Sequence, residues 1–131
     1  MNREKLVDLY KKYELAKEDV YKHQHYVIIT RMGIEKIAAK ENITINYEVI
    51  RCEPKFAVFK ASAYISTKPN TVIETFGSAL KGDNYKDGNC NSWYVAEMAE
   101  KRALSRAVLK LTGFYELGVF GEDESEDFKK K

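Results

Sequence analysis

The chain has 131 residues, a length that fits one domain with one modest core. Its composition, 44% hydrophobic and 32% charged, is ordinary for a soluble globular protein. No apolar run reaches the roughly 18 residues that a membrane span needs, and the first ten residues lack the apolar stretch of a secretory signal. We therefore expect a cytoplasmic protein without a membrane partner, in which Cys52 and Cys90 are free thiols.

The charge is divided unevenly along the chain. Residues 122–127 read "EDESED" and hold five acids, whereas residues 1–121 hold 19 cationic and 15 acidic side chains, a net charge of +4. A mildly basic body with an acidic tail suggests contact with a polyanion. The tail could compete with that polyanion, recruit a protein partner, or act only as a disordered solubilising segment.

The first third of the chain predicts a helix, a strand and a short helix. Residues 3–17 place leucine and tyrosine at helical spacing, residues 21–30 are typical of a strand, and residues 31–42 form a second helical pattern. His23 and His25 stand two apart in the expected strand, where we interpret them as half-exposed side chains and expect no metal site.

The middle of the chain changes to a period of two. Residues 42–53, 55–67 and 71–81 alternate apolar and polar side chains, and proline-containing turns at Pro54 and Pro69 separate them. This pattern predicts three consecutive antiparallel strands, with the earlier strand added at an edge. Alternation predicts that helices cover one face of this sheet.

A polar loop over residues 81–91 precedes the last predicted helix, which Asn91 or Ser92 would cap and Gly113 would end. The element order is then α-β-α-β-β-β-α, an α+β fold with a three- to four-stranded antiparallel sheet and helices packed on one face. We divide the chain into an N-terminal helix (residues 1–20), an α+β core (21–114) and an acidic, flexible C-terminal tail (115–131).

The last helix is predicted to carry a basic ridge beside a small-residue face. At about 100° per residue, Arg102, Arg106 and Lys110 lie along one side. The neighbouring sector holds Trp93, Ala96, Ala103, Leu104, Ala107, Val108 and Leu111. We expect that sector to pack closely on the sheet while the ridge stays exposed. Glu100 falls inside the same sector, so it needs a partner such as Arg31 or a second subunit, unless the helix is rotated further.

At this helix the sequence resembles a known family. "EMAEKRALSRAVLKLTG", residues 97–113, is similar to the signature helix of the single-strand DNA annealing proteins. This is the Rad-fifty-two superfamily, which includes phage recombination proteins of the Erf, Sak and Red-beta types. "ITRMGIEKIAAKENI", residues 29–43, resembles the segment in which an arginine ends the first strand of that family. The likeness covers about residues 21–114.

The resemblance implies ATP-independent binding of single-stranded DNA and annealing of complementary strands in homologous recombination and repair. It implies a homo-oligomeric ring or filament with a basic groove, no enzymatic activity and no cofactor. The sequence has no GxxxxGK[ST] phosphate loop, in agreement with that mechanism. A stand-alone annealer suits a phage protein in the host-cell cytoplasm, and the acidic tail is then a candidate contact for a replication or recombination protein.

The resemblance also assigns DNA-contacting residues. Lys101 and Arg102 match the adjacent basic pair of the family, and Arg31 matches its arginine after the first strand. A third helix cation of the family falls on Ser105, and Arg106 stands one position later, so the role of Arg106 stays open. The expected DNA-binding set, with loop residues added for phosphate contact and base stacking, is Arg31, Lys81, Tyr85, Lys86, Lys101, Arg102, Arg106 and Lys110.

Three other interpretations remain. One is a small-molecule or protein-binding module of cystatin-like or NTF-two-like shape, with a helix cradled by a curved sheet. Another is a metal-dependent nuclease, because Glu53-Pro54-Lys55 has the spacing of a restriction-type ExK motif, although proline at a turn argues against the strand that the motif requires. The third is a structural protein that binds only a protein partner.

Overall fold

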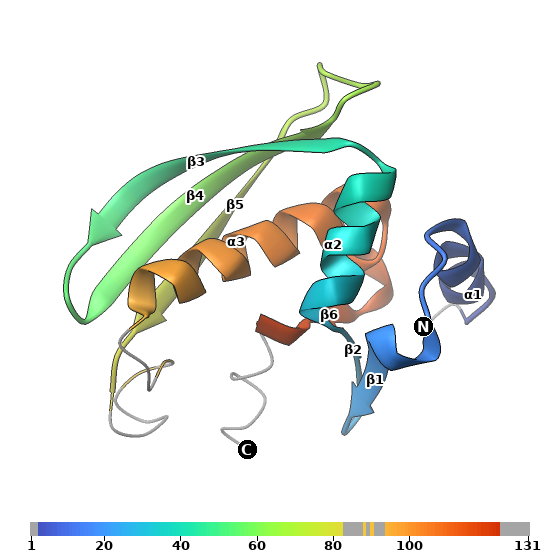
Figure 1. The fold of residues 1–131 in the computed structure, drawn as a ribbon, viewed down its shortest axis with the longest axis horizontal. Helices are drawn as coiled ribbons and strands as arrows, with labels where there is room; N and C mark the ends of the chain where they lie inside the picture. Colours follow the sequence, from blue (N-terminus) through green and yellow to red (C-terminus); the bar gives the residue numbers. More distant parts are fainter. Residues whose placement is uncertain (1–2, 83–87, 89, 91–93, 124–131) are drawn as a thin grey trace.

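The computed structural model describes residues 3–82, 88, 90 and 94–123. It has the α+β architecture that the sequence predicts, with helices packed against a mostly antiparallel arrangement of strands (Figure 1). The elements are α1 (Arg3–Lys12), β1 (Val20–His23), β2 (Tyr26–Ile29), α2 (Arg31–Lys40), β3 (Ile43–Cys52), β4 (Phe56–Ile65), β5 (Ile73–Leu80), α3 (Val95–Thr112) and β6 (Val119–Gly121). Single 3-10 turns, η1 (Lys17–Asp19) and η2 (Tyr115–Leu117), precede β1 and β6.

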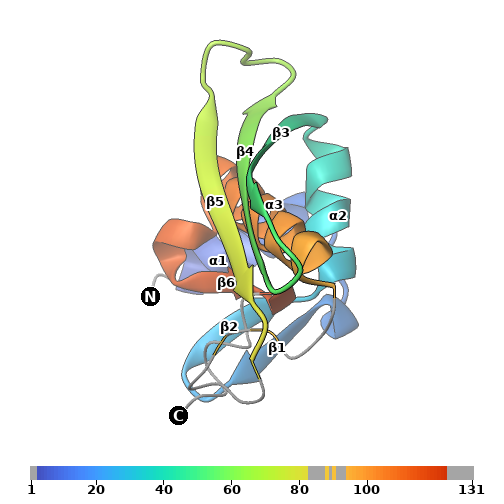
Figure 2. The ribbon, with the colours of Figure 1, turned by 90° about the vertical axis from the view of Figure 1, so that its left-hand side faces the viewer.

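The larger sheet is the predicted three-stranded antiparallel one, in the order β3-β4-β5. Burial along β4 alternates, because every second side chain from Ala57 to Ala63 faces α3 and the others face away. Figure 2 shows the three long strands side by side with α3 crossing behind them. A register shift between Val49 and Arg51 marks a bulge in β3.

Helix α3 approaches the sheet very closely because both surfaces are built from small side chains. Ala99, Ala103 and Ala107 are fully buried against alanines of β4 and β5. Opposite them, a Cβ atom placed on Gly77 would lie 2.1 Å from the backbone oxygen of Ala99. The Thr75 hydroxyl donates a hydrogen bond to the backbone oxygen of Ala103 over 2.7 Å. The predicted close docking through alanines is confirmed, and Gly77 is the partner that permits it.

The predicted strand over residues 21–30 is instead a hairpin in a second sheet, and its addition to the edge of the large sheet was a wrong prediction. Strands β1 and β2 pair antiparallel around Gln24, whose positive φ of 56° makes the turn. His23 ends β1 and His25 lies in the turn, so the two histidines do not share a strand. Strand β2 then pairs in parallel with β6, giving the order β1-β2-β6.

The folded part extends beyond residue 114, where we expected a flexible tail to begin. Phe114 and Val119 are fully buried and lie in one hydrophobic cluster with Ile29, Ile34 and other residues of the N-terminal half. Strand β6 is apolar but only three residues long, so it carries no period that a sequence could display. Residues 124–131 lie outside the described residues.

The N-terminal helix is shorter than expected, and it belongs to the same cluster. Helix α1 ends at Lys12, and Leu6 and Tyr13 are buried beside Phe114. Helix α2 begins after Thr30, whose side chain accepts a hydrogen bond from the backbone N–H of Gly33. Helix α3 ends at Thr112, and Gly113 adopts a left-handed φ of 87°, as the sequence predicts. Asn91 and Ser92 lie outside the described residues, and the cap of α3 is Tyr94.

We expect Gly77→Ala to lower the free energy of unfolding by about 3 kcal/mol, because the added methyl group forces α3 away from β5. Gly113→Ala is the matched control, since it adds the same atom where the nearest heavy atom is 3.5 Å away. Its cost comes only from the left-handed backbone, about 1 kcal/mol. Urea unfolding of both variants measures the difference, and equal losses would contradict the close approach at Gly77.

Candidate nucleic-acid interface

Two arginines of the predicted basic ridge of α3, Arg102 and Arg106, lie along the outer edge of β5. Arg102 is only 3% exposed, and its Nη1 donates to the backbone oxygen of Ser78 over 2.7 Å. One helical turn later, Arg106 Nη1 donates to the backbone oxygen of Phe76 over 2.8 Å. Carbonyl groups two residues apart in a strand point to the same side, so two arginines four residues apart bond the edge of β5.

The buried face of α3 is therefore rotated from the one that the helical pattern predicted. Val95 and Ala99, which stand outside the predicted apolar sector, are buried, whereas Leu104 and Leu111 inside it are only half-buried. Glu100 is exposed, so it does not need the buried partner that we expected. Its charge acts on Tyr47 of β3 instead: burial, and then the nearby Glu100 carboxylate, raise the pKa of Tyr47 to about 12.

The N-terminus of α2 brings Arg31 to the same part of the molecule. Arg31 is the first residue of α2, and its backbone N–H donates to Glu122 Oε1 over 3.0 Å. Its half-exposed side chain lies 3.7 Å from Glu35 Oε1 in a pair across one turn. Such exposed pairs contribute little to stability. The guanidinium of Arg31 can therefore be drawn to another anion at low cost.

Asp123, just after β6, contacts Arg102, one of the predicted DNA-contacting residues, and also Ser105. Its backbone oxygen accepts a hydrogen bond from Arg102 Nε over 3.0 Å. Its carboxylate accepts one from the Ser105 hydroxyl over 3.3 Å. Ser105 itself is 1% exposed and lies between Lys101 and Arg102 around the helix. The carboxylate thus sits over the position that the resemblance assigned to a third helix cation.

The Asp123 carboxyl is subject to opposing electrostatic effects. Burial raises the pKa of the Asp123 carboxyl, because a low-dielectric environment disfavours the charged form. Attraction to Lys101, the Ser105 hydrogen bond and attraction to Arg31 all act in the opposite direction. Cations from α2 and from α3 therefore act on one acidic group. We call the group Arg31, Lys101, Arg102 and Ser105 the anion cluster.

The other predicted DNA-contacting residues do not join the anion cluster. Lys110 is exposed, and its Nζ lies 5.3 Å from the ring centroid of Tyr115. Lys81 follows β5, where its backbone N–H donates to the Lys55 oxygen. Tyr85 and Lys86 lie outside the described residues. Along the β5 edge the order is Arg106, Arg102 and then Lys81, so these cations follow the strand beyond the cluster.

The structure also places the features behind the rival interpretations. Glu53 is exposed and lies in the turn between β3 and β4, where its Oε2 is 2.9 Å from Arg51 Nε. The residues with ExK spacing therefore lie outside a strand.

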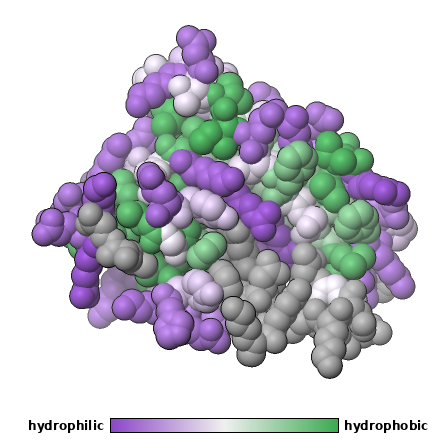
Figure 3. Space-filling view, turned by 180° about the vertical axis from the view of Figure 1, so that it is seen from behind, coloured by the Kyte–Doolittle hydropathy of each residue, from purple (hydrophilic) through white to green (hydrophobic). Residues whose placement is uncertain are grey.

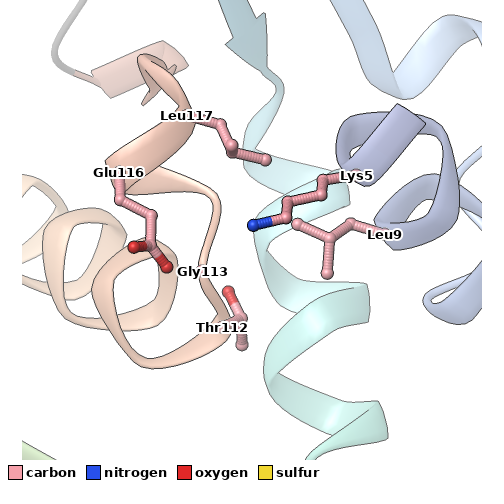
Figure 4. A pocket seen from close by; sticks show the side chains of 6 residues that line it. All are labelled: Lys5, Leu9, Thr112, Gly113, Glu116 and Leu117. Atoms are coloured by element: carbon pink, nitrogen blue, oxygen red, sulfur yellow. The ribbon is translucent and has the colours of Figure 1, made fainter. Parts of the chain in front are cut away.

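A pocket of about 420 Å³ lies between α1 and the end of α3 (Figure 4). Lys5 extends into it beside Leu9 and Leu117, with Glu116 across the opening. The lining thus combines one cation and one acid with two leucines.

The described residues contain neither a cluster of metal ligands nor a helix suited to span a membrane. In residues 3–82, 88, 90 and 94–123, no three His, Cys, Asp or Glu side chains gather closely enough to hold a metal ion. No helix of this part of the chain combines the length and apolar character of a membrane span.

Seen from behind, a band of hydrophilic side chains separates clusters of hydrophobic ones (Figure 3).

Sequence reasoning found the cations of the anion cluster but missed their neighbours. Ser105 was known only as a departure from the family pattern, and Glu122 and Asp123 were assigned to the tail. The acidic run and the small residue between two cations can both be read from the sequence. Strand β6, which places the acids beside α2 and α3, was not predicted.

Comparison with known proteins gives no further assignment: no family model, curated protein or solved structure matches the chain.

Arg106→Met should lower the free energy of unfolding by about 1–2 kcal/mol, because the carbonyl group of Phe76 loses a charged hydrogen-bond donor. Lys110→Met is the control. It removes one positive charge from the same helix but only an exposed cation–π contact, worth roughly 0.5 kcal/mol. Urea unfolding distinguishes the two variants. Equal and small losses would mean that Arg106 does not stabilise the edge of β5.

Proposed function

We propose that this protein binds single-stranded DNA without sequence preference and anneals complementary strands without ATP, acting in the cytoplasm. The observation that carries the proposal is that Arg102 bonds the backbone oxygen of Asp123 while the charges of Lys101 and Arg31 both act on the Asp123 carboxylate. The resemblance assigns all three to DNA contact, although Arg31 lies 70 residues before the adjacent pair Lys101 and Arg102. Their shared action on Asp123 supports a common role in holding a phosphate.

The chemistry of the anion cluster suits a phosphodiester better than a base edge. Two guanidinium groups and an ammonium supply many donors and no acceptor, and the Ser105 hydroxyl adds one more polar group. Phosphate contacts position a nucleic acid without reading its sequence. A protein that anneals arbitrary complementary strands needs this property, because the base edges must remain available to the second strand.

The two edges of the large sheet support assembly into an oligomer. Arginines bond the outer edge of β5, whereas no strand of the described part of the chain pairs with the outer edge of β3. Strand β3 also exposes Tyr47, Val49 and Ile50. A long edge strand with exposed apolar side chains favours pairing with another chain. We infer that copies of this protein meet at β3, so that successive anion clusters form a longer basic track.

The double variant Arg31→Ala/Lys101→Ala should weaken binding to an oligo-dT strand about tenfold and make the salt dependence shallower. Loss of two phosphate contacts is expected to reduce the slope of log K against log salt by roughly 1.4. Fluorescence anisotropy in EDTA measures affinity. Fluorescence transfer between labelled complementary strands measures annealing. Arg102 is left intact, because its removal would also remove its hydrogen bond to the backbone oxygen of Ser78 in β5.

Lys11→Ala/Lys17→Ala is the matched control, since it removes two exposed cations from α1 and η1 and changes the net charge equally. This variant should keep nearly the affinity of the parent protein. If both double variants lose affinity to the same extent, binding depends on overall charge rather than on the anion cluster. If the folded parent protein neither binds nor anneals DNA, the proposed function is wrong.

A further inference from the structure

The acidic pair that follows β6 forms hydrogen bonds with residues that the proposed function assigns to DNA. Glu122 Oε1 accepts a hydrogen bond from the backbone N–H of Arg31, at the first turn of α2. Asp123 accepts from Arg102 Nε through its backbone oxygen and from the Ser105 hydroxyl through its carboxylate. Three of the four anion-cluster residues therefore have a hydrogen-bond partner within two consecutive acidic residues.

Two of the three acceptors are carboxylate oxygens and the third is the backbone oxygen of Asp123. A carboxylate makes the same kind of contacts that a phosphate oxygen would make. Both are anionic acceptors that take hydrogen bonds from guanidinium groups, hydroxyl groups and backbone N–H groups at helix N-termini. The contacts join distant parts of the chain, since Glu122 meets Arg31 across 91 positions of sequence. Local chain geometry therefore does not explain them.

We propose that Glu122 and Asp123 act as an internal substitute for the nucleic-acid backbone, so that DNA must displace them from the anion cluster in order to bind. This inference rests on the proposed function and adds regulation to the same site. The intact protein then binds DNA more weakly than its cations alone would allow, because only molecules with the acids displaced are competent to bind.

The attachment of the acidic pair allows such a displacement. Val119 is fully buried and Gly121 pairs with Ile29, so β6 is held by the core up to the residue before Glu122. Beyond Gly121, Glu122 and Asp123 make polar contacts with the anion cluster. A change of backbone direction after Gly121 can release both acids while β6 stays paired with β2.

The test is the double variant Glu122→Gln/Asp123→Asn, which keeps size and hydrogen-bonding capacity but removes both negative charges. Its control is Glu4→Gln/Asp8→Asn on α1, where two exposed acids undergo the same chemical change. Anisotropy with fluorescein-labelled oligo-dT in EDTA, at one fixed salt concentration, measures affinity. We expect Glu122→Gln/Asp123→Asn to bind roughly three- to tenfold more tightly than the parent, and the control to change less than twofold.

Combination with Arg31→Ala/Lys101→Ala locates the effect. If the acids act by covering the anion cluster, their neutralisation should give little or no gain once Arg31 and Lys101 are absent. A gain that persists in that background, or an equal gain in the α1 control, would overturn the inference. If binding depends on Arg31 and Lys101 but neutralisation gives no gain, the acids do not compete and the proposed function stands. If no folded variant binds, both proposals fail.

A measurement on the unmodified protein covers the case in which the neutralised variant does not fold. Saturation with unlabelled oligo-dT should shift the backbone amide resonances of Glu122, Asp123 and Ser105, because the acids leave and a phosphate arrives. Amides of the pocket-lining residues Leu9 and Leu117 provide the reference. Unchanged resonances at Glu122 and Asp123 in DNA-saturated protein would show that DNA binds without displacing them.

Discussion

The close approach of α3 to β5 is the constraint on which the rest of the structure depends. Gly77 lies against the backbone of α3, and the alanines on either side of the contact leave no space for larger side chains. Because the helix axis lies so near the sheet, Arg102 and Arg106 reach past the edge of β5 and turn back to its carbonyl groups. A helix held further out would present these arginines to solvent, as the helical pattern alone suggested.

Arg102 consequently has two roles that cannot be separated by its removal. Its Nη1 bonds Ser78 at the sheet edge, and its Nε bonds the segment after β6. A buried guanidinium requires most of its donors to be satisfied, since an unpaired buried charge is costly. One of these bonds goes to a backbone oxygen outside the sheet, which an incoming phosphate oxygen can replace without leaving the donor unsatisfied. The structural bond at Ser78 then holds the guanidinium in position for either acceptor.

The sequence predicted those elements whose apolar residues repeat regularly or whose ends are marked by proline or glycine. Strands β3, β4 and β5 alternate over eight or more residues, and their turns contain proline. Gly113 ended α3 where expected. The hairpin around Gln24 and the three-residue β6 were missed because neither is long enough to show a period, and because the turn uses a non-glycine residue at positive φ. The rotation of α3 was missed because an arginine is assumed to face water, whereas here a sheet edge supplies its acceptors.

For the same reason, the sequence predicted the cations of the candidate site but not the acidic residues that contact them. Cations on a helix and an arginine at a helix start can be matched to a family pattern one residue at a time. The acidic pair belongs to the site only through tertiary contacts, because the pairing of β6 with β2 places Glu122 and Asp123 beside α2 and α3.

Ser105 of α3 contacts the acidic segment that follows β6. A long cationic side chain at this position would fill the space over α3 and strengthen the hold on a nucleic acid. A serine gives up that cation, but it leaves room for the carboxylate of Asp123 and donates a hydrogen bond to it. Ser105, at which the sequence differs from the pattern that it resembles, is therefore in direct contact with the acidic segment after β6. Under the proposed function, a surface with one cation fewer can be covered by the chain's own acids, and a surface that can be covered can also be regulated.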